Sequence, residues 1–478
     1  MELERLVAAL APEAVLGSPD PVEVRDLAYD ARAVTPGAAF FAVPGEVADG
    51  HDFAVQAVEN GASVLVVERA VEPEVPQLVV PSTRRAMATA ADVFFGEPTR
   101  ELEVAGVTGT NGKTTTAFLL YAILAAAGRR PGLLGTVESR VGGQPRPVVR
   151  TTPEAIDLQR TFREMLDAGD RSVALEASSH AAVLHRLDRV RFDALVFTNL
   201  TQDHLDFHGT MEAYFEAKRK LFTGVAPPPA AVNVGDPWGR KLAEELEDVG
   251  RAPLLTFGFA EDAELRPDGL VLDGSGARFT AAGIELETSL RGRFNVENVL
   301  GAVAAGILLG LDEEEIAAGV KALEGVPGRF EAVDEGQPFT VLVDYAHTPD
   351  SLDNVLRAAR DIATGRVLVV FGAGGDRDRG KRPLMGKIAA DLADVVVVTS
   401  DNPRSEEPVA IIQDILQGAG MGVEIDPDRS SAIARAIGLA EEGDVVVIAG
   451  KGHEQGQEVG SEKLPFDDRL VAREVLRT

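Results

Sequence analysis

The stretch Gly106-Val107-Thr108-Gly109-Thr110-Asn111-Gly112-Lys113-Thr114-Thr115-Thr116 decides the fold of this chain. It follows an extended apolar segment, 102–107, and opens a helix-like segment, 113–127. A glycine-rich turn between a strand and a helix gathers backbone N–H groups, and the helix dipole favours anions there. A lysine at the helix start reaches terminal phosphates, and the threonine hydroxyls after it hold Mg²⁺. Gly109 and Gly112 bracket only two residues, fewer than in the usual loop. The turn still predicts a nucleotide phosphate site made of Gly109, Thr110, Asn111, Gly112, Lys113, Thr114 and Thr115.

The composition is that of an acidic protein without cysteine. The 478 residues carry 47 basic and 76 acidic side chains, a net charge of −29. This charge argues against a nucleic-acid partner, because such binding depends on neutralising phosphates. The lack of cysteine excludes disulfides, thiolate metal sites and cysteine nucleophiles. No apolar run approaches the roughly 18 residues that span a bilayer, and the first residues do not resemble a signal peptide. We therefore expect a cytoplasmic protein, not inserted in a membrane, and a monomer.

Apolar runs alternate with helix-like segments along the chain, which predicts an α/β fold with parallel sheets. The length suits about three domains. Breaks at Gly96-Glu97-Pro98 and Gly325-Val326-Pro327-Gly328 place these domains at residues 1–97, 98–328 and 329–478. We expect a small α/β domain, a central phosphate-loop domain and a C-terminal Rossmann-like domain. In the last of these, strands are expected at 340–343, 366–371, 395–399 and 445–449.

Polar side chains follow two expected strands of the central domain. Glu176 ends the strand 173–176, and Asp203-His204 lie shortly after the strand 194–199. Ligands of open α/β sheets bind beyond the carboxyl ends of the strands. Glu176 is therefore a candidate metal ligand facing the phosphate loop, although a carboxylate that caps the next helix would look the same. The histidines and aspartates at 203–208 could serve magnesium or a phosphoryl group.

Lys218 lies on the apolar face of the expected helix 210–222. It shares the helical spacing of Met211, Tyr214, Leu221 and Phe222, whereas Arg219 and Lys220 do not. A lysine in such a place usually extends its amine to solvent along an apolar surface. Otherwise a buried amine needs a partner or a chemical change, such as addition of CO₂ to give an anionic carbamate.

Several motifs along nearly the whole chain resemble the Mur ligase family. They are 108–116, 176–180, 198–208, Asp344-Tyr345-Ala346-His347-Thr348-Pro349-Asp350, and 374–383. Asp401-Asn402-Pro403-Arg404 and Gly450-Lys451-Gly452-His453-Glu454 resemble the members that add a diamino acid. The resemblance implies an ATP-dependent carbon–nitrogen ligase of peptidoglycan biosynthesis. ATP would phosphorylate the D-glutamate carboxylate of UDP-MurNAc-L-Ala-D-Glu, and the amine of a diamino acid would displace phosphate from the acyl phosphate.

The resemblance also implies roles for residues of the central domain. Lys113 would contact the phosphates, and Mg²⁺ would be held by Thr115, Glu176 and His204. Lys218 matches the lysine that is carbamylated in the family. Other matching positions would contact the nucleotide: Asn295, Asn298, Arg329, Asp344 and His347. A further set would contact the UDP-muramoyl-dipeptide: Ala31 in the N-terminal UDP-binding domain, with Thr151, Thr152, Ser178 and Arg186.

The amino-acid pocket implied by the resemblance consists of Arg382, Asp401, Asn402, Arg404, Gly450 and Glu454. Arg404 would pair with the distal carboxylate of meso-2,6-diaminopimelate, which lysine and ornithine lack. The sequence departs from the family beside this pocket, because Gln455-Gly456-Gln457 replace the usual Asp-Tyr-Gln. In the UDP-binding domain, Ala31 replaces the usual serine. L-Ornithine and L-lysine thus remain possible substrates. A phosphate loop would also suit two different functions, a folylpolyglutamate-type ligase and a non-catalytic nucleotide-sugar binding protein.

Overall fold

The computed structural model describes residues 1–17, 22–45, 48–224, 226–420 and 422–478. The chain forms two compact units, residues 1–106 with 129–193, and residues 107–128 with 194–478. Strand β6 (Glu103–Thr108) begins in the first unit and ends in the second. This division differs from the three expected segments, whose boundaries stay a prediction. Each unit combines parallel strands with flanking helices, so the predicted α/β class is confirmed.

The first unit opens with a five-stranded sheet in the order β1-β5-β4-β3-β2, in which only β1 is antiparallel to its neighbour. Side chains alternate between its two faces. Phe41 and Val66 pack with helices α1 and α3, whereas Phe40 and Leu65 pack with α2. The elements are α1 (Leu3–Leu10), β1 (Ala14–Leu16), β2 (Asp26–Ala28), β3 (Ala38–Phe41), α2 (Ala54–Glu59), β4 (Val64–Val67), β5 (Gln77–Val79) and α3 (Thr83–Phe94).

The rest of the first unit contains four strands in the order β10-β7-β8-β9. β10 is parallel to β7, and β7, β8 and β9 form an antiparallel meander. The start of helix α5 joins the apolar core of the five-stranded sheet through Ala155 and Ile156. The elements are β7 (Pro131–Leu134), β8 (Ser139–Val141), β9 (Gln144–Arg146), α5 (Ala155–Ala168), β10 (Ser172–Glu176) and α6 (Ser179–Val183).

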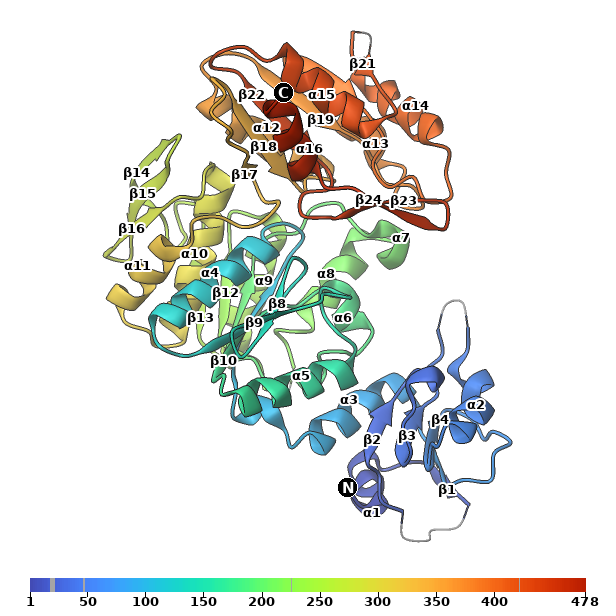
Figure 1. Cartoon of the computed structure of the whole chain (residues 1–478). Helices are drawn as coiled ribbons and strands as arrows, with labels where there is room; N and C mark the ends of the chain where they lie inside the picture. Colours follow the sequence, from blue (N-terminus) through green and yellow to red (C-terminus); the bar gives the residue numbers. More distant parts are fainter. Residues whose placement is uncertain (18–21, 46–47, 225, 421) are drawn as a thin grey trace. The chain divides into compact units, whose positions relative to one another are not determined.

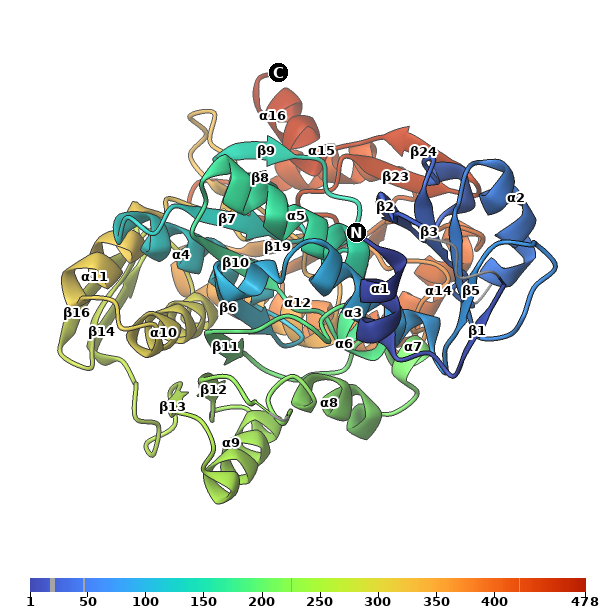
Figure 2. The ribbon, with the colours of Figure 1, turned by 90° about the horizontal axis from the view of Figure 1, so that it is seen from below.

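The second unit begins with helix α4 (Lys113–Ala126), which follows the phosphate loop. Helices α10 and α11 contact α4, and α11 also contacts β16 (Figure 2). Strands β11, β12 and β13 run parallel, and β14, β15 and β16 form an antiparallel sheet. The elements are β11 (Ala194–Phe197), α7 (Leu205–His208), α8 (Met211–Arg219), β12 (Ala230–Asn233), α9 (Pro237–Val249), β13 (Leu254–Phe257), β14 (Asp268–Asp273), β15 (Gly276–Ala281), β16 (Ile284–Thr288), α10 (Arg293–Leu308) and α11 (Glu313–Ala322).

The last part of the second unit is a six-stranded sheet in the order β17-β18-β22-β19-β20-β21. All neighbours are parallel except β17. Helices α12, α13 and α14 cover one face, and α15 and α16 cover the other (Figure 1). The elements are β17 (Glu331–Ala332), β18 (Thr340–Asp344), α12 (Pro349–Ile362), β19 (Val367–Phe371), α13 (Lys381–Leu392), β20 (Val395–Val398), α14 (Pro408–Ala419), β21 (Glu424–Ile425), α15 (Arg429–Leu439), β22 (Val445–Ala449), β23 (Gly456–Val459), β24 (Glu462–Pro465) and α16 (Asp468–Leu476).

The four strands expected in this sheet are present within one residue of the predicted bounds. Their carboxyl ends lead into the loops that hold the motifs Asp344–Asp350, 374–382, 401–404 and 450–454. The parallel register therefore gathers these loops at one edge of the sheet. None of the helices in the described part of the chain has the length and apolar character needed to span a membrane.

Candidate active site

The phosphate loop runs from the end of β6 to the start of α4 and has room for glycine alone at two positions. Gly109 and Gly112 have φ angles of 147° and 85°. A Cβ atom at Gly109 would lie 1.9 Å from Thr198 Oγ1, and one at Gly112 would lie 2.2 Å from Asn298 Oδ1. The loop is held from the end of β11, where Asn199 Oδ1 accepts the N–H of Asn111 at 2.9 Å. This is a backbone cradle of the kind that binds phosphate groups.

Two lysines share one carbonyl oxygen of this loop. Lys113 Nζ donates to Gly109 O at 3.1 Å and to Thr110 O at 2.6 Å. Lys218 Nζ, on α8, donates to Gly109 O at 2.8 Å. The side chain of Lys218 is buried, so the expectation that it reaches solvent is wrong and the inward orientation is confirmed. Burial and the nearby charge of Lys113 lower the pKa of Lys218 well below its ordinary value, which favours the neutral amine.

The Tyr214 ring lies beside the Lys218 amine and also contacts two histidines. The amine lies 4.7 Å from the centroid of the Tyr214 ring, and Tyr214 Oη lies 3.2 Å from Thr110 Oγ1. The Tyr214 ring stacks on His208 at 4.8 Å and meets His204 edge-on at 6.1 Å. Tyr214 thus links the phosphate loop to the predicted catalytic pair, His204 and Lys218.

Asp203 lies between two histidines. Its Oδ2 is 3.5 Å from His204 Nε2 and 3.7 Å from His347 Nε2. Burial alone would raise the pKa of Asp203, but its interaction with His347 and the positive charges of His347, His204 and Lys381 hold that pKa well below its ordinary range. Asp203 therefore carries a negative charge that orients both imidazole rings, a role that the motif alone did not reveal.

Arg329, just before β17, and Asp350, at the start of α12, contact the phosphate loop and the start of α4. Arg329 Nη2 donates to Thr114 Oγ1 at 3.2 Å, and Asn111 Nδ2 donates to Asp350 Oδ2 at 2.7 Å. Asp344 accepts the N–H groups of Phe330 and Ala346 at 2.6 and 2.7 Å. The structure thus brings Arg329 and Asp350 to the loop, and the contacts of Arg329, Asp344 and His347 with a nucleotide stay predictions.

The two predicted adenine contacts are neighbours on α10. Asn298 Nδ2 donates to Asn295 Oδ1 at 3.0 Å, and Asn298 Oδ1 lies 3.5 Å from Thr116 Oγ1. Both asparagines are buried. Their contact with adenine stays a prediction.

Three of the residues predicted for the amino-acid pocket, Asp401, Asn402 and Glu454, surround a buried lysine that the sequence did not single out. Lys451 is fully buried, and its Nζ donates to Asn402 Oδ1 at 2.8 Å and to Glu454 Oε2 at 2.9 Å. Asp401 Oδ1 lies 3.9 Å from the same amine, and a Cβ atom at Gly450 would lie 2.4 Å from Asp401 Oδ2. The quoted motif 450–454 contained Lys451, but only its burial shows that it holds the pocket together.

A buried ion pair holds the ends of β20 and β22, from which the 401–404 and 450–454 loops start. Arg429 and Asp468 are fully buried, and their closest side-chain atoms lie 2.7 Å apart. Arg429 also donates to Ser400 O at 3.3 Å and to Ala449 O at 3.0 Å. It therefore ties together the carbonyl groups where β20 and β22 end. No sequence pattern signalled this pair, because the two residues are 39 positions apart and belong to α15 and α16.

Arg382 and Arg404 differ in how far their guanidinium groups are already paired. Arg382 is fully buried and binds Glu406 at 2.8 Å and Asp414 at 2.9 Å. This geometry favours a role in holding the 374–382 loop over direct contact with a ligand. Arg404 is 24% exposed and binds Glu458 Oε2 at 2.8 Å through Nε. Contact of either arginine with an amino acid stays a prediction.

In the first unit, Glu176 is buried and held by a residue that sequence reasoning missed. Thr136 donates its N–H to Glu176 Oε1 at 2.8 Å and its hydroxyl to Glu176 Oε2 at 3.0 Å. Thr136 Oγ1 also lies 3.0 Å from Thr151 Oγ1. The side chain of Glu176 does not cap α6, since Ser178 accepts the N–H of Ala181 there. The only signal for Thr136 is its place just after β7.

The other predicted dipeptide contacts also meet in the first unit. Thr152 Oγ1 lies 3.2 Å from Ser178 Oγ, and Thr152 O accepts from Arg186 Nη1 at 3.0 Å. Arg186 pairs with Glu154 at 2.7 Å. Ala31 O accepts from Asn60 Nδ2 at 2.9 Å. Their contacts with a substrate stay predictions.

The structure does not test whether the three predicted ligands, Thr115, Glu176 and His204, bind a metal ion together. Glu176 belongs to the first unit, whereas Thr115 and His204 belong to the second. Within the residues that the structure describes, no cluster of three or more histidine or acidic side chains is arranged to hold a metal ion. The oxygen donors of Thr115 and Glu176 nevertheless suit Mg²⁺, which prefers hard oxygen ligands.

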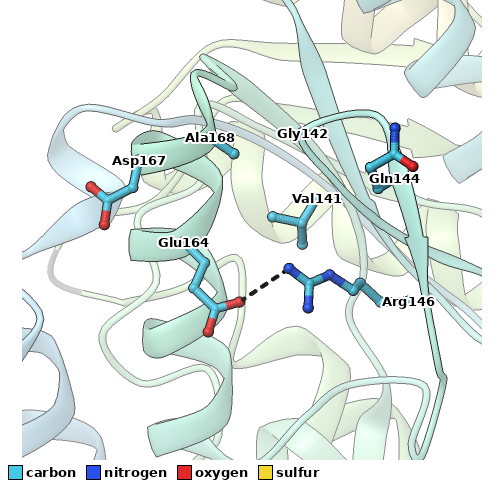
Figure 3. Close-up of a pocket in the computed structure, with 7 residues that line it drawn as sticks. All are labelled: Val141, Gly142, Gln144, Arg146, Glu164, Asp167 and Ala168. Carbon is cyan, nitrogen blue, oxygen red and sulfur yellow. Dashed lines mark ion pairs between the residues drawn. The ribbon is translucent and has the colours of Figure 1, made fainter.

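Three cavities of the described surface are lined by other residues than these clusters. One of about 660 Å³ lies between the β8–β9 hairpin and α5, where Arg146 and Glu164 approach to 4.0 Å (Figure 3). Two others, of about 510 and 570 Å³, share Arg293 and Glu297. None of the predicted site residues lines these three cavities.

The glycine-rich loop at a helix start, with two lysine amines on one of its carbonyls, places the second unit in the class of phosphate-loop proteins. Three profiles of the Mur ligase family match consecutive parts of the chain: the catalytic domain of the family over residues 23–109, the middle domain over 107–306, and the glutamate ligase domain over 328–452. The chain belongs to the Mur ligase family, as its motifs predicted, and is a ligase.

Similar proteins cover nearly the whole chain. The UDP-N-acetylmuramoyl-L-alanyl-D-glutamate–2,6-diaminopimelate ligase of Geobacillus thermodenitrificans is 48% identical over 475 residues, 96% of each chain. The protein of the same name from Solibacter usitatus is 47% identical over 485 residues, 99% of this chain and 96% of its own. A solved structure of a ligase with that name is 33% identical, covers 95% of both chains and has a TM-score of 0.68.

Proposed function

We propose that this chain joins meso-2,6-diaminopimelate to UDP-MurNAc-L-Ala-D-Glu at the expense of ATP, in peptidoglycan synthesis. The names of relatives at 47–48% identity support the two substrates. The phosphate loop with Lys113 and the buried Lys218 supports the use of ATP. The burial of Lys218 against Gly109 O is the observation that carries the proposal, because a phosphate loop that served only to bind a nucleotide would not need a second, buried lysine.

The reaction begins with transfer of the γ-phosphoryl group of ATP to the D-glutamate carboxylate. A carboxylate is a poor electrophile, and phosphorylation supplies a leaving group. Because two anions must meet, cations have to screen them. Lys113 and Arg329 are the cationic side chains of this chain at the loop. The amine of the diamino acid then attacks the acyl phosphate, forming an amide and releasing phosphate.

Mg²⁺ and a carbamate on Lys218 are parts of the same proposal. Thr115, Glu176 and His204 would hold the metal ion, which neutralises phosphate charge when bound. The neutral, buried amine of Lys218 is the form to which CO₂ adds, and Lys113 is a cation close enough to influence its pKa. The carbamate would supply an additional negative charge at the loop.

The proposed substrates and the proposed monomeric state are tested separately. Phosphate release from ATP is measured with UDP-MurNAc-L-Ala-D-Glu and, separately, meso-diaminopimelate, L-lysine or L-ornithine. We expect turnover mainly with diaminopimelate. Turnover mainly with lysine or ornithine would keep the reaction and change the amino acid, and silence with all three would overturn the proposal. The proposal also includes the cytoplasmic location and the monomeric state that the sequence predicts. Light scattering after size-exclusion chromatography tests the monomeric state.

A further inference from the structure

The hairpin of β23 and β24 is attached to the loop that carries Arg404. Gln457 Nε2 donates to Asp401 O at 2.6 Å, and the N–H of Glu458 donates to Asn402 Oδ1 at 2.9 Å. Arg404 donates its N–H to Glu458 O at 3.1 Å, and its carbonyl accepts the N–H of Gly460 at 2.8 Å. The hairpin is therefore a frame for the Asp401–Arg404 loop. Its first residue, Gly456, is one of the two positions beside the predicted pocket where the sequence departs from the family pattern.

Within this frame, the Arg404 side chain is oriented by two acceptors from different loops. Arg404 Nε donates to Glu458 Oε2 at 2.8 Å, and Arg404 Nη1 donates to Gly375 O at 2.8 Å. In the described part of the chain, Nη2 has no hydrogen-bond partner. Because a guanidinium group is planar, fixing Nε and Nη1 also fixes the direction of the remaining N–H groups.

The backbone around Arg404 also constrains the orientation of its side chain. Arg404 has a φ of 51°, in the left-handed region that a residue with a long side chain rarely adopts. A Cβ atom at Gly375 would lie 1.8 Å from Pro403 O, so the carbonyl that accepts from Nη1 belongs to a turn packed against the loop. The pairing of β23 and the turn at Gly375 hold Arg404 from two sides.

We propose that Glu458 is a positioning residue that determines amino-acid specificity by presenting Arg404 to the distal carboxylate of the incoming diamino acid. This inference rests on the proposed function. A side chain held in its binding orientation before the ligand arrives loses less conformational entropy on binding. Glu458 also compensates the charge of Arg404 while the pocket is empty. A ligand carboxylate that binds the Nη edge gains a fixed partner, whereas an amino acid without that carboxylate gains nothing from Glu458.

Variants of Glu458 separate this role from a structural one. Glu458→Ala removes the acceptor, and we expect the KM for meso-diaminopimelate to rise about ten-fold with little change in kcat. The kcat/KM for L-lysine should stay unchanged, because lysine does not use the Arg404 guanidinium. Glu458→Gln keeps an acceptor for Nε and should retain most of the affinity for diaminopimelate. Glu462→Ala, on the partner strand β24, is the matched control and should behave as wild type.

A double-variant cycle tests the connection to Arg404. If Glu458 acts through Arg404, Glu458→Ala should add nothing to the loss in Arg404→Ala. Additive losses, equal losses for lysine and diaminopimelate, or an unchanged KM in Glu458→Ala would each overturn the inference. So would a Glu458→Gln variant as weak as Glu458→Ala. Thermal melting of each full-length variant identifies any that fail to fold. If wild-type protein is silent with every amino acid, the proposed function fails first.

Discussion

At the scale of single residues, Lys218 is a position where burial of the amine opposes its protonation. Its amine is buried against Gly109 O, and its pKa is lowered mainly by burial. The unfolded chain therefore binds more protons than the folded chain between that lowered pKa and the ordinary value near 10.4. Stability rises with pH across this window, because the cost of burying a group that prefers to be protonated disappears.

Lys218→Met should lower the activity and raise the thermal stability of the protein. We expect kcat/KM to fall at least ~10²-fold and raised bicarbonate not to restore it, because the amine is absent. In bicarbonate-free buffer the variant should melt at a higher temperature than wild type at pH 7, and the difference should shrink toward pH 10. Wild-type-like turnover in the variant would remove the catalytic role of Lys218. A melting difference that grows with pH would contradict the assignment of a neutral buried amine.

Thr136 is the second residue whose substitution is informative. Thr136→Val keeps the N–H bond to Glu176 and loses the hydroxyl bonds to Glu176 and Thr151. A hydrogen bond to a charged group contributes about 1.5–3 kcal/mol. If Glu176 holds Mg²⁺, the variant should need more Mg²⁺ for half-maximal rate, and Thr136→Ser should not. Initial rates are titrated with Mg²⁺, and binding of Mn²⁺ is measured separately. Together they distinguish weaker metal binding from a general loss of activity.

At the scale of elements, the turn before α4 depends on the absence of a side chain. Gly112→Ala would place a Cβ atom 2.2 Å from Asn298 Oδ1 at a φ of 85°. We expect loss of ATP binding in calorimetry and a destabilisation of ~1–3 kcal/mol. Gly128→Ala, at a φ of 69° with open space around it, is the control for backbone strain alone. If both variants bind ATP equally, the loop is not the phosphate site.

Elements with apolar patterns could be predicted from the sequence, and elements without them could not. The strands β18, β19, β20 and β22 are continuous apolar runs, and their bounds were predicted closely. The β14–β16 sheet and the β23–β24 hairpin were missed. β14 and β24 are mostly exposed and carry no periodic signal, and the alternation of β16 covers only five residues. In the site, helical spacing predicted the inward orientation of Lys218, and the structure showed that its amine is buried. The pairs Arg404–Glu458 and Arg429–Asp468 depend on tertiary contacts that spacing does not contain.

At the scale of the whole molecule, the net charge of −29 makes the placement of buried carboxylates important for stability. Burial raises the pKa of Glu297 to about 7, and the charges of Asp236 and Asp350 also raise it, whereas Arg293 lowers it. Since the folded pKa lies above the ordinary value near 4.3, the folded state binds more protons between the two. Stability associated with Glu297 is therefore present at low pH and is lost as pH rises toward 7 and above.

Glu297→Gln tests this dependence on the intact protein. The variant should melt at a higher temperature than wild type at pH 8, where wild-type Glu297 must ionise in a half-buried place near Asp236 and Asp350. At pH 5, where the carboxyl group keeps its proton, the two proteins should melt at similar temperatures. Calorimetric scans at both pH values measure the difference. A variant that is less stable than wild type at pH 8 would show that the carboxylate is stabilised there.

The buried pair of Arg429 and Asp468 has a consequence for the order in which the protein is made. Asp468 opens α16 and is synthesised after every other residue of the Asp401–Glu454 network. During translation, the segment that carries the phosphate loop emerges well before Asp468, since the chain is made from its N-terminal side. Until Asp468 leaves the ribosome, Arg429 is a cation without its carboxylate partner beneath the ends of β20 and β22. The loops of the predicted amino-acid pocket should therefore become ordered after the phosphate loop, and nascent chains should acquire nucleotide affinity before affinity for the predicted amino acid.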